Sequence, residues 1–246
     1  MGISDIFIKR ISIEQGKSKE FPYTLPIIKN TKQITFKKNV TFFVGENGTG
    51  KSTMLEAIAV AYGFNAEGGS KNFNFSTANT HSDLYKDITL IKGCRLPKTS
   101  YFLRAESFYN LATNIDDLSK LTNGENFLNN YGGKSLHDQS HGESFISLFL
   151  SRFQHNGLYL LDEPEAALSP TNQITLFRLI HDFAKNGSQF IIASHSPIIL
   201  ALPHSEILSF DGSRLTKVQY EETNHYLITK YFFFNRERYI DSILDD

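Results

Sequence analysis

One short motif constrains this chain more than any other feature. Residues 45–52 read Gly-Glu-Asn-Gly-Thr-Gly-Lys-Ser and match the pattern G-x-x-x-x-G-K-[ST] at every fixed position. An apolar segment, 40–44 (VTFFV), precedes the motif, and residues 51–62 follow with apolar side chains at helical spacing. This order predicts a strand, a glycine-rich loop that cradles phosphates, and a helix whose N-terminus faces the anion.

The motif predicts a nucleotide site that also needs Mg²⁺. Lys51 is expected to reach the β- and γ-phosphates, and the Ser52 hydroxyl is expected to bind the metal. A chance glycine-rich turn is the alternative, and the strand and helix around the loop argue against it. The residues predicted to hold the nucleotide in this loop are Asn47, Gly48, Thr49, Gly50, Lys51, Ser52 and Thr53.

Composition limits the class of protein. The chain has 246 residues with a formal net charge of -1, and its hydrophobic fraction of 40% is that of an ordinary globular protein. No apolar run approaches the roughly 20 residues that a transmembrane helix needs. The first ten residues lack a long apolar segment, and the single cysteine, Cys94, cannot form an internal disulfide. We therefore expect no signal peptide and a cytoplasmic location.

The remaining pattern predicts an α/β fold of the P-loop NTPase type. Short apolar strands alternate with helices, which favours a mostly parallel sheet flanked by helices, and an Asp211-Gly212 turn predicts an antiparallel hairpin at its edge. The expected strands are 7–13, 33–36, 40–44, 88–91, 100–103, 158–161, 190–193, 207–210 and 214–218. The expected helices are 51–62, 144–153, 173–185 and 223–244, the last broken near Asn235, with short helices in the polar segment 108–139.

Two acids follow the predicted strand 158–161. Asp162 is placed to hold Mg²⁺, and Glu163 to act as the general base that polarises the attacking water. A strand that merely ends in polar residues is the alternative, but the phosphate loop upstream favours the catalytic interpretation.

A histidine and a serine pair follow the next strand. His195, in Ala-Ser-His-Ser-Pro, is expected at the carboxyl edge of the sheet, where it could donate to a γ-phosphate or orient the water. Alternatively Ser196 caps a helix that begins at Pro197 and His195 only lies nearby; both can hold together. Ser140 and Gly142 precede another helix and could form a second anion site or an ordinary helix cap.

In this order the motifs resemble those of the ABC-type ATPase heads. Gly45–Ser52 resembles the Walker A motif, Ser140–Glu143 the signature motif, Asp162-Glu163 the Walker B motif and catalytic glutamate, Ala167-Leu168-Ser169 the D-loop, and His195 the switch histidine. The resemblance spans about residues 34–210. It implies a head-to-tail homodimer in which ATP on one copy is covered by Ser140, Gly142 and Glu143 of the other.

The resemblance also implies a domain plan. The whole chain, 1–246, would be one ABC-type ATPase domain, with a core lobe at 1–106 and 154–246 and a small helical subdomain at 107–153 that carries the signature motif. Segment 107–139 is too short for a coiled-coil arm. The chain is therefore most similar to stand-alone bacterial AAA/ABC ATPases, related to the heads of structural-maintenance-of-chromosomes and DNA-repair ATPases.

Several positions depart from the family pattern. The signature reads Gln-Ser-His-Gly-Glu, and Ser169 stands where the D-loop usually has Asp. Glu106 is the positional candidate for the Gln-loop residue, and Tyr23 or Phe21 for the aromatic that stacks on adenine.

The expected function is a conformational switch driven by ATP hydrolysis, which acts on a partner protein or a nucleic acid. The alternatives are the ATP-binding subunit of a membrane transporter and a nucleotide-binding module without turnover. Residues 1–38 carry eight basic and three acidic residues, a net charge of +5, which fits nucleic acid or an ordinary solvated strand face. The aromatic run 231–234 is expected to pack on the core, with a partner-docking surface as the alternative.

Overall fold

A mixed six-stranded sheet forms the centre of the computed structural model, which describes residues 6–14, 20–66, 68–69, 82–104 and 141–244. In spatial order its strands are β5 (Ser100–Arg104), β6 (Leu158–Asp162), β7 (Gln189–Ala193), β3 (Val40–Val44), β8 (Glu206–Ser209) and β9 (Thr216–Val218). Neighbouring strands are parallel except β8 and β9, which form an antiparallel hairpin. The predicted mostly parallel sheet, its central VTFFV strand and its edge hairpin are confirmed.

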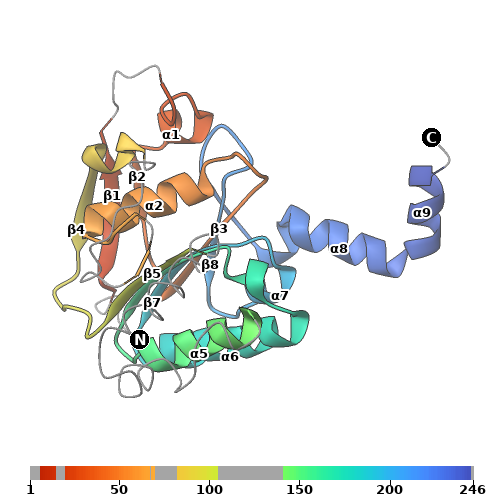
Figure 1. Cartoon of the computed structure of the whole chain (residues 1–246). Helices are drawn as coiled ribbons and strands as arrows, with labels where there is room; N and C mark the ends of the chain where they lie inside the picture. Colours follow the sequence, from red (N-terminus) through yellow and green to blue (C-terminus); the bar gives the residue numbers. More distant parts are fainter. Residues whose placement is uncertain (1–5, 15–19, 67, 70–81, 105–140, 245–246) are drawn as a thin grey trace.

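A second sheet lies across one face of the first. Its three antiparallel strands are β2 (Gln33–Thr35), β1 (Ile8–Ile13) and β4 (Ile88–Lys92), with β1 in the middle. Helix α2 (Lys51–Tyr62) lies between the two sheets (Figure 1). The short helix α1 (Pro26–Asn30) and the 3₁₀ turn η2 (Asp83–Asp87) complete this layer.

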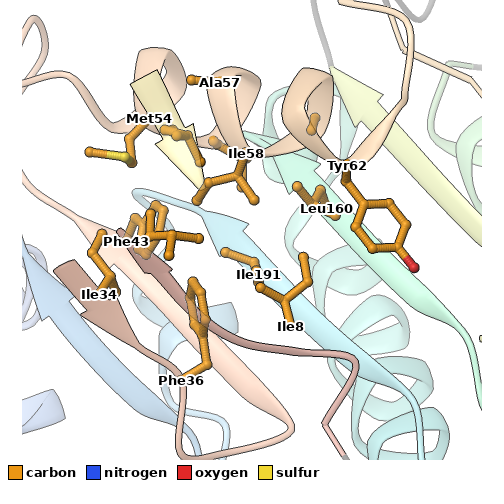
Figure 2. Packing of buried hydrophobic residues seen from close by; sticks show 14 of the residues in the cluster. Ile8, Ile34, Phe36, Phe43, Met54, Ala57, Ile58, Tyr62, Leu160 and Ile191 are labelled. Atoms are coloured by element: carbon orange, nitrogen blue, oxygen red, sulfur yellow. The ribbon is translucent and has the colours of Figure 1, made fainter. Parts of the chain in front are cut away.

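Helix α2 is buried because both of its sides meet apolar strands. Figure 2 shows Met54 and Ile58 of α2 in one apolar cluster with Ile8 of β1 and Phe43 and Ile191 of the central sheet. Every residue of β3, β6 and β7 is buried, and successive side chains alternate between the two faces of the sheet. This double burial explains why these strands read as uninterrupted apolar runs.

Three helices cover the other face of the central sheet (Figure 1): α5 (His141–Arg152), α6 (Pro170–Lys185) and α7 (Pro197–Leu200). Aromatic rings join two of these helices to the strands: Phe149 of α5 stacks on Phe190 of β7 with ring centroids 6.3 Å apart, and Phe183 of α6 meets Tyr159 of β6 edge to face at 6.4 Å. Helix α6 begins three residues earlier than predicted. Ser169 caps it and accepts a hydrogen bond from the backbone N–H of Asn172, while Pro170 takes the first helical position.

The C-terminal segment corrects the sequence interpretation. Helices α8 (Asn224–Phe234) and α9 (Arg236–Leu244) form with the predicted break at Asn235, but neither contains a buried residue. Together they make an arm that extends away from the body of the molecule (Figure 1). Phe233 is 73% exposed and Phe234 81% exposed, so the predicted packing of this aromatic run on the core is wrong.

The physical reason lies in helix geometry. Consecutive residues on an α-helix point about 100° apart, so four aromatic residues in a row face all sides and cannot share one buried stripe. No helix in the described part of the chain is long and apolar enough to cross a membrane.

Candidate functional site

The phosphate loop joins β3 to α2 at the carboxyl edge of the central sheet. Gly50 adopts a left-handed conformation, with φ of 99°, and its carbonyl accepts the N–H of Met54 to start the helix. Gly45 has φ of 145°, and a Cβ there would lie 3.1 Å from the Asp211 carboxylate. Both positions therefore favour glycine for backbone reasons. Asn47 and Gly48 are exposed at the tip, and Ser52 and Thr53 lie partly buried in the first turn of α2.

Lys51 is buried beneath this loop. Its Nζ donates to the carbonyl oxygens of Gly45 at 2.7 Å and Glu46 at 3.0 Å. Burial lowers the pKa of Lys51, and the nearby carboxylate of Glu163 opposes that effect. The structure therefore brings the predicted phosphate-binding cation close to the predicted general base.

Asp211 is a residue whose role sequence reasoning missed. It was interpreted only as part of a hairpin turn, yet its Oδ1 accepts the backbone N–H of Glu46 at 2.7 Å. Its Oδ2 also accepts the hydroxyl of Ser209 at 3.2 Å. The β8–β9 turn thus fixes the start of the phosphate loop, and a contact across 165 residues leaves no local signal in the sequence.

The two acidic residues at the end of β6 differ in their burial and in their contacts. Asp162 is the last residue of the strand and is buried, with its Oδ2 3.7 Å from Nε of Arg104 on the neighbouring strand. Nη1 of the same arginine donates to Glu56 of α2 at 2.7 Å. Arg104 therefore links the acid to the helix that follows the phosphate loop.

Glu163 is more exposed and has an unusual backbone. Its φ and ψ are both 50°, a left-handed conformation that costs a non-glycine residue about 1 to 3 kcal/mol. Its N–H donates to the carbonyl of Ala193, and its Oε1 lies 3.5 Å from Nε2 of His195. The strained turn thus orients the carboxylate toward the histidine of the adjacent strand end.

Glu165 holds the His195 loop in place and was also missed. Its Oε1 accepts three hydrogen bonds, from the Ser194 hydroxyl at 2.9 Å and the backbone N–H groups of His195 and Ser196 at 2.5 and 3.1 Å. Burial raises its pKa, although these donors oppose the shift. No motif pointed to this carboxylate, because the loop that it binds is about 30 residues away.

Two substitutions of Glu165 separate its role as a hydrogen-bond acceptor from the ionisation of its carboxyl group. Glu165→Ala leaves the three donors without their acceptor and should lower the free energy of unfolding by about 2 to 4 kcal/mol in urea titrations. Glu165→Gln keeps an acceptor oxygen and should cost less.

Because the folded-state pKa of Glu165 is raised, the wild type loses stability as pH rises through that pKa, whereas Gln does not titrate. The wild type should therefore lose more stability than Glu165→Gln as pH rises above the ordinary glutamate pKa of 4.5. Identical urea midpoints for Ala and wild type would contradict this role.

The predicted cap at the start of α7 is confirmed. Ser196 does cap α7, accepting the N–H of Ile199 at 3.2 Å. His195 is nonetheless next to Glu163, and its other ring nitrogen contacts His225 of α8. The sequence offered no reason to connect His225 with this site.

Four of the other predicted positions have no described side chain. Ser140 and Glu106 lie outside the described residues, as does segment 105–140, and α5 is the described part of the predicted helical subdomain. Gly142 and Glu143 lie in the first turn of α5, where only the backbone is described. Burial, together with the hydrogen bond that the Tyr23 hydroxyl donates to Asp87, raises the pKa of Tyr23 to about 12. Phe21 is exposed.

The donor set suits Mg²⁺. The Ser52 hydroxyl and the Asp162 carboxylate are hard oxygen ligands, and Mg²⁺ typically takes one or two protein oxygens together with phosphates and water. Within the described ranges, no three His, Cys, Asp or Glu side chains gather into a metal cluster of their own. Ser52 and Asp162 therefore fit a magnesium ion that phosphate oxygens also bind.

Comparison with curated proteins gives distant relatives. The cytochrome c biogenesis ATP-binding export protein CcmA of Legionella pneumophila is 27% identical over 162 residues, covering 63% of this chain and 78% of CcmA. The ABC transporter G family member STR2 of Medicago truncatula is 24% identical over 204 residues, or 76% of this chain. The chain spans only 28% of the length of STR2.

Solved structures share the fold. An Smc head domain of Pyrococcus furiosus, bound to the C-terminal domain of ScpA, matches with a TM-score of 0.53 at 12% identity, covering 94% of this chain and 99% of that one. A family model described as an AAA domain matches residues 23–191, which include the phosphate loop, Asp162 and Glu163. The chain therefore belongs to the AAA domain family, and its fold is also that of the Smc head.

Proposed function

We propose that this chain hydrolyses ATP at the edge of the central sheet and that ATP joins two copies into a head-to-tail dimer, which acts as a switch on a partner. The observation that carries the catalytic part is the convergence of Lys51, Glu163 and His195. Glu163 and His195 lie 3.5 Å apart, and the charge of Glu163 acts on Lys51. These are a phosphate-binding cation, a carboxylate base and a neighbouring imidazole.

Each residue has a distinct role in the proposed reaction. The backbone N–H groups of the loop and Nζ of Lys51 bind the phosphate oxygens. A carboxylate oxygen of Glu163 takes a proton from water as the water oxygen attacks the γ-phosphorus, and the bond to the β–γ bridging oxygen breaks to leave ADP. His195 donates from Nε2 to a γ-phosphate oxygen. Ser52 and Asp162 would hold Mg²⁺, which would neutralise the phosphate charge.

Removal of the metal tests this proposal directly. With ATP and Mg²⁺ the protein should release inorganic phosphate, and excess EDTA should reduce that release at least about 100-fold because the phosphate charge is no longer neutralised. Added Mg²⁺ should restore the rate, whereas Ca²⁺ at the same concentration should restore less, because its longer and more variable coordination fits the site less well. Undiminished phosphate release in EDTA would contradict the proposed metal site.

The dimer proposal rests on the order of the motifs. The signature residues Ser140, Gly142 and Glu143, carried by the proposed helical subdomain 107–153, would cover the ATP that is bound to the phosphate loop of the second copy. A partner outside the head is supported by the exposed aromatic arm, since large exposed apolar patches are typical of interaction surfaces. Solved Smc heads include complexes with ScpA, which gives a precedent for heads that bind a separate protein.

A second candidate is the ATP-binding subunit of a membrane transporter. The observation that favours it is the match to CcmA, an ATP-binding export protein. Recovery of the protein from cells in complex with an integral membrane protein would favour this candidate, and recovery only in membrane-free complexes would favour the switch.

Nucleic acid is a third class of partner. The basic residues Arg10, Lys29, Lys32, Lys37 and Lys38 are exposed. Affinity for DNA that falls steeply as the salt concentration rises would support this partner. The slope of log affinity against log salt concentration increases with the number of DNA phosphates that the protein neutralises.

A further inference from the structure

The first turn of α8 places a second histidine against the proposed catalytic one. Nε2 of His225 lies 2.9 Å from Nδ1 of His195, and the two rings are 5.0 Å apart at 63°. The other nitrogen of His195, Nε2, lies 3.5 Å from Oε1 of Glu163. His195 is therefore held between an imidazole on one side and a carboxylate on the other.

The position of His225 is set by a chain of hydrogen bonds. The Tyr220 hydroxyl donates to the carbonyl of Pro197 at 2.8 Å, which ties the segment before α8 to the first residue of α7. The Thr223 hydroxyl donates to the carbonyl of Tyr220 at 2.7 Å and accepts the N–H of Tyr226 at 3.3 Å as the cap of α8. Since α7 directly follows the His195 loop, both histidines are fixed to the same local framework.

The two contacts of His195 select one tautomer. A neutral imidazole carries one N–H donor and one bare acceptor nitrogen. If the proton were on Nδ1, the bare Nε2 would face the carboxylate of Glu163, and their lone pairs would repel. With the proton on Nε2, that N–H faces Glu163, and the bare Nδ1 accepts the N–H of His225.

His225 is suited to act as this donor. Burial lowers the pKa of His225, so its neutral ring is favoured. A neutral His225 with its proton on Nε2 has one donor, and that donor faces His195.

We propose that His225 is a positioning residue for ATP hydrolysis, donating from Nε2 to Nδ1 of His195 and so fixing the tautomer that presents an Nε2–H to the γ-phosphate. This inference rests on the proposed role of His195 and adds a residue that lies outside the motifs. Residues that orient a functional imidazole through its far nitrogen are a recognised means of fixing its tautomer.

Three variants test the contact by kinetics. His225→Leu keeps a bulky side chain but has no donor, and kcat should fall about tenfold while KM for ATP stays within about twofold. His225→Gln carries an amide N–H near the position of the imidazole Nε2, and kcat should return to within about threefold of wild type. Asn224→Ala, on the exposed side of the same turn, is the matched control and should behave as wild type.

A second readout does not depend on activity. Nitrogen-15 NMR of the histidine rings should show His195 as the Nε2–H tautomer in wild type and in His225→Gln. In His225→Leu the signal should shift toward a mixture of both tautomers. An unchanged His195 spectrum in His225→Leu would overturn the inference.

His195→Ala separates this inference from the function beneath it. A reduced kcat in His195→Ala together with a wild-type kcat in His225→Leu would overturn only the positioning role of His225. A wild-type kcat in His195→Ala would overturn the proposed role of His195 and, with it, the positioning role of His225. A reduced kcat in both His195→Ala and His225→Leu, with kcat restored in His225→Gln, would support the roles of both histidines.

Discussion

Glu163→Gln is expected to lower the rate of phosphate release by about 10²- to 10³-fold, because the amide cannot take the proton of the attacking water. ATP affinity should change little, since Lys51 and the backbone N–H groups of the loop are retained. Glu163 is partly exposed, so the fold should tolerate the change. Single-turnover measurements of phosphate release with excess enzyme would give the chemical rate directly.

The same variant tests the proposed dimer. If ATP joins two copies and hydrolysis separates them, Glu163→Gln with ATP and Mg²⁺ should elute as a dimer in sizing chromatography, while wild type returns to monomer as ATP is consumed. Glu221→Gln, an exposed acid before α8, is the matched control and should behave as wild type. A monomer under these conditions would contradict the dimer, and a normal hydrolysis rate would contradict the role of Glu163.

Lys51→Ala is expected to weaken ATP binding by at least about 2 kcal/mol, or about 30-fold, because truncating one partner of a desolvated charge contact typically costs 2 to 5 kcal/mol. Hydrolysis should fall with it. Lys51→Ala also removes the hydrogen bonds of Nζ to the carbonyls of Gly45 and Glu46, so the stability of the variant is measured alongside its affinity.

Titration of a fluorescent ATP analogue would measure the affinity, with unfolding by urea as the check on folding. Lys98→Ala removes an exposed lysine remote from the phosphate loop in sequence and serves as the control. Equal affinity of Lys51→Ala and wild type would show that the loop binds phosphate without this cation, contrary to the proposal.

Features encoded over short stretches could be predicted from the sequence. The helix 51–62 is found with its predicted bounds, because Gly50 and Gly63 take left-handed conformations at its two ends. The hairpin around Asp211-Gly212 and the fully apolar strands were predicted for the same reason: turn residues and periodicity are local.

Contacts between distant segments could not be predicted. Glu165 with the His195 loop, Asp211 with the phosphate loop, and His225 with His195 each join residues 30 or more positions apart. The prediction that the aromatic run 231–234 packs on the core was wrong for a related reason. Apolar composition predicts burial only where another element covers the helix, and in the described structure α5, α6 and α7 already cover the available face of the sheet.

The arm has a mechanical consequence. Helix α8 has 11 residues, so at about 1.5 Å per residue it is a stiff rod about 16 Å long. One end holds His225 against His195, and the other carries the exposed ring of Phe234. From that length, a tilt of about 10° about the Thr223 end displaces Phe234 by about 3 Å. A sideways displacement of the aromatic tip would therefore change the position of His225 relative to His195.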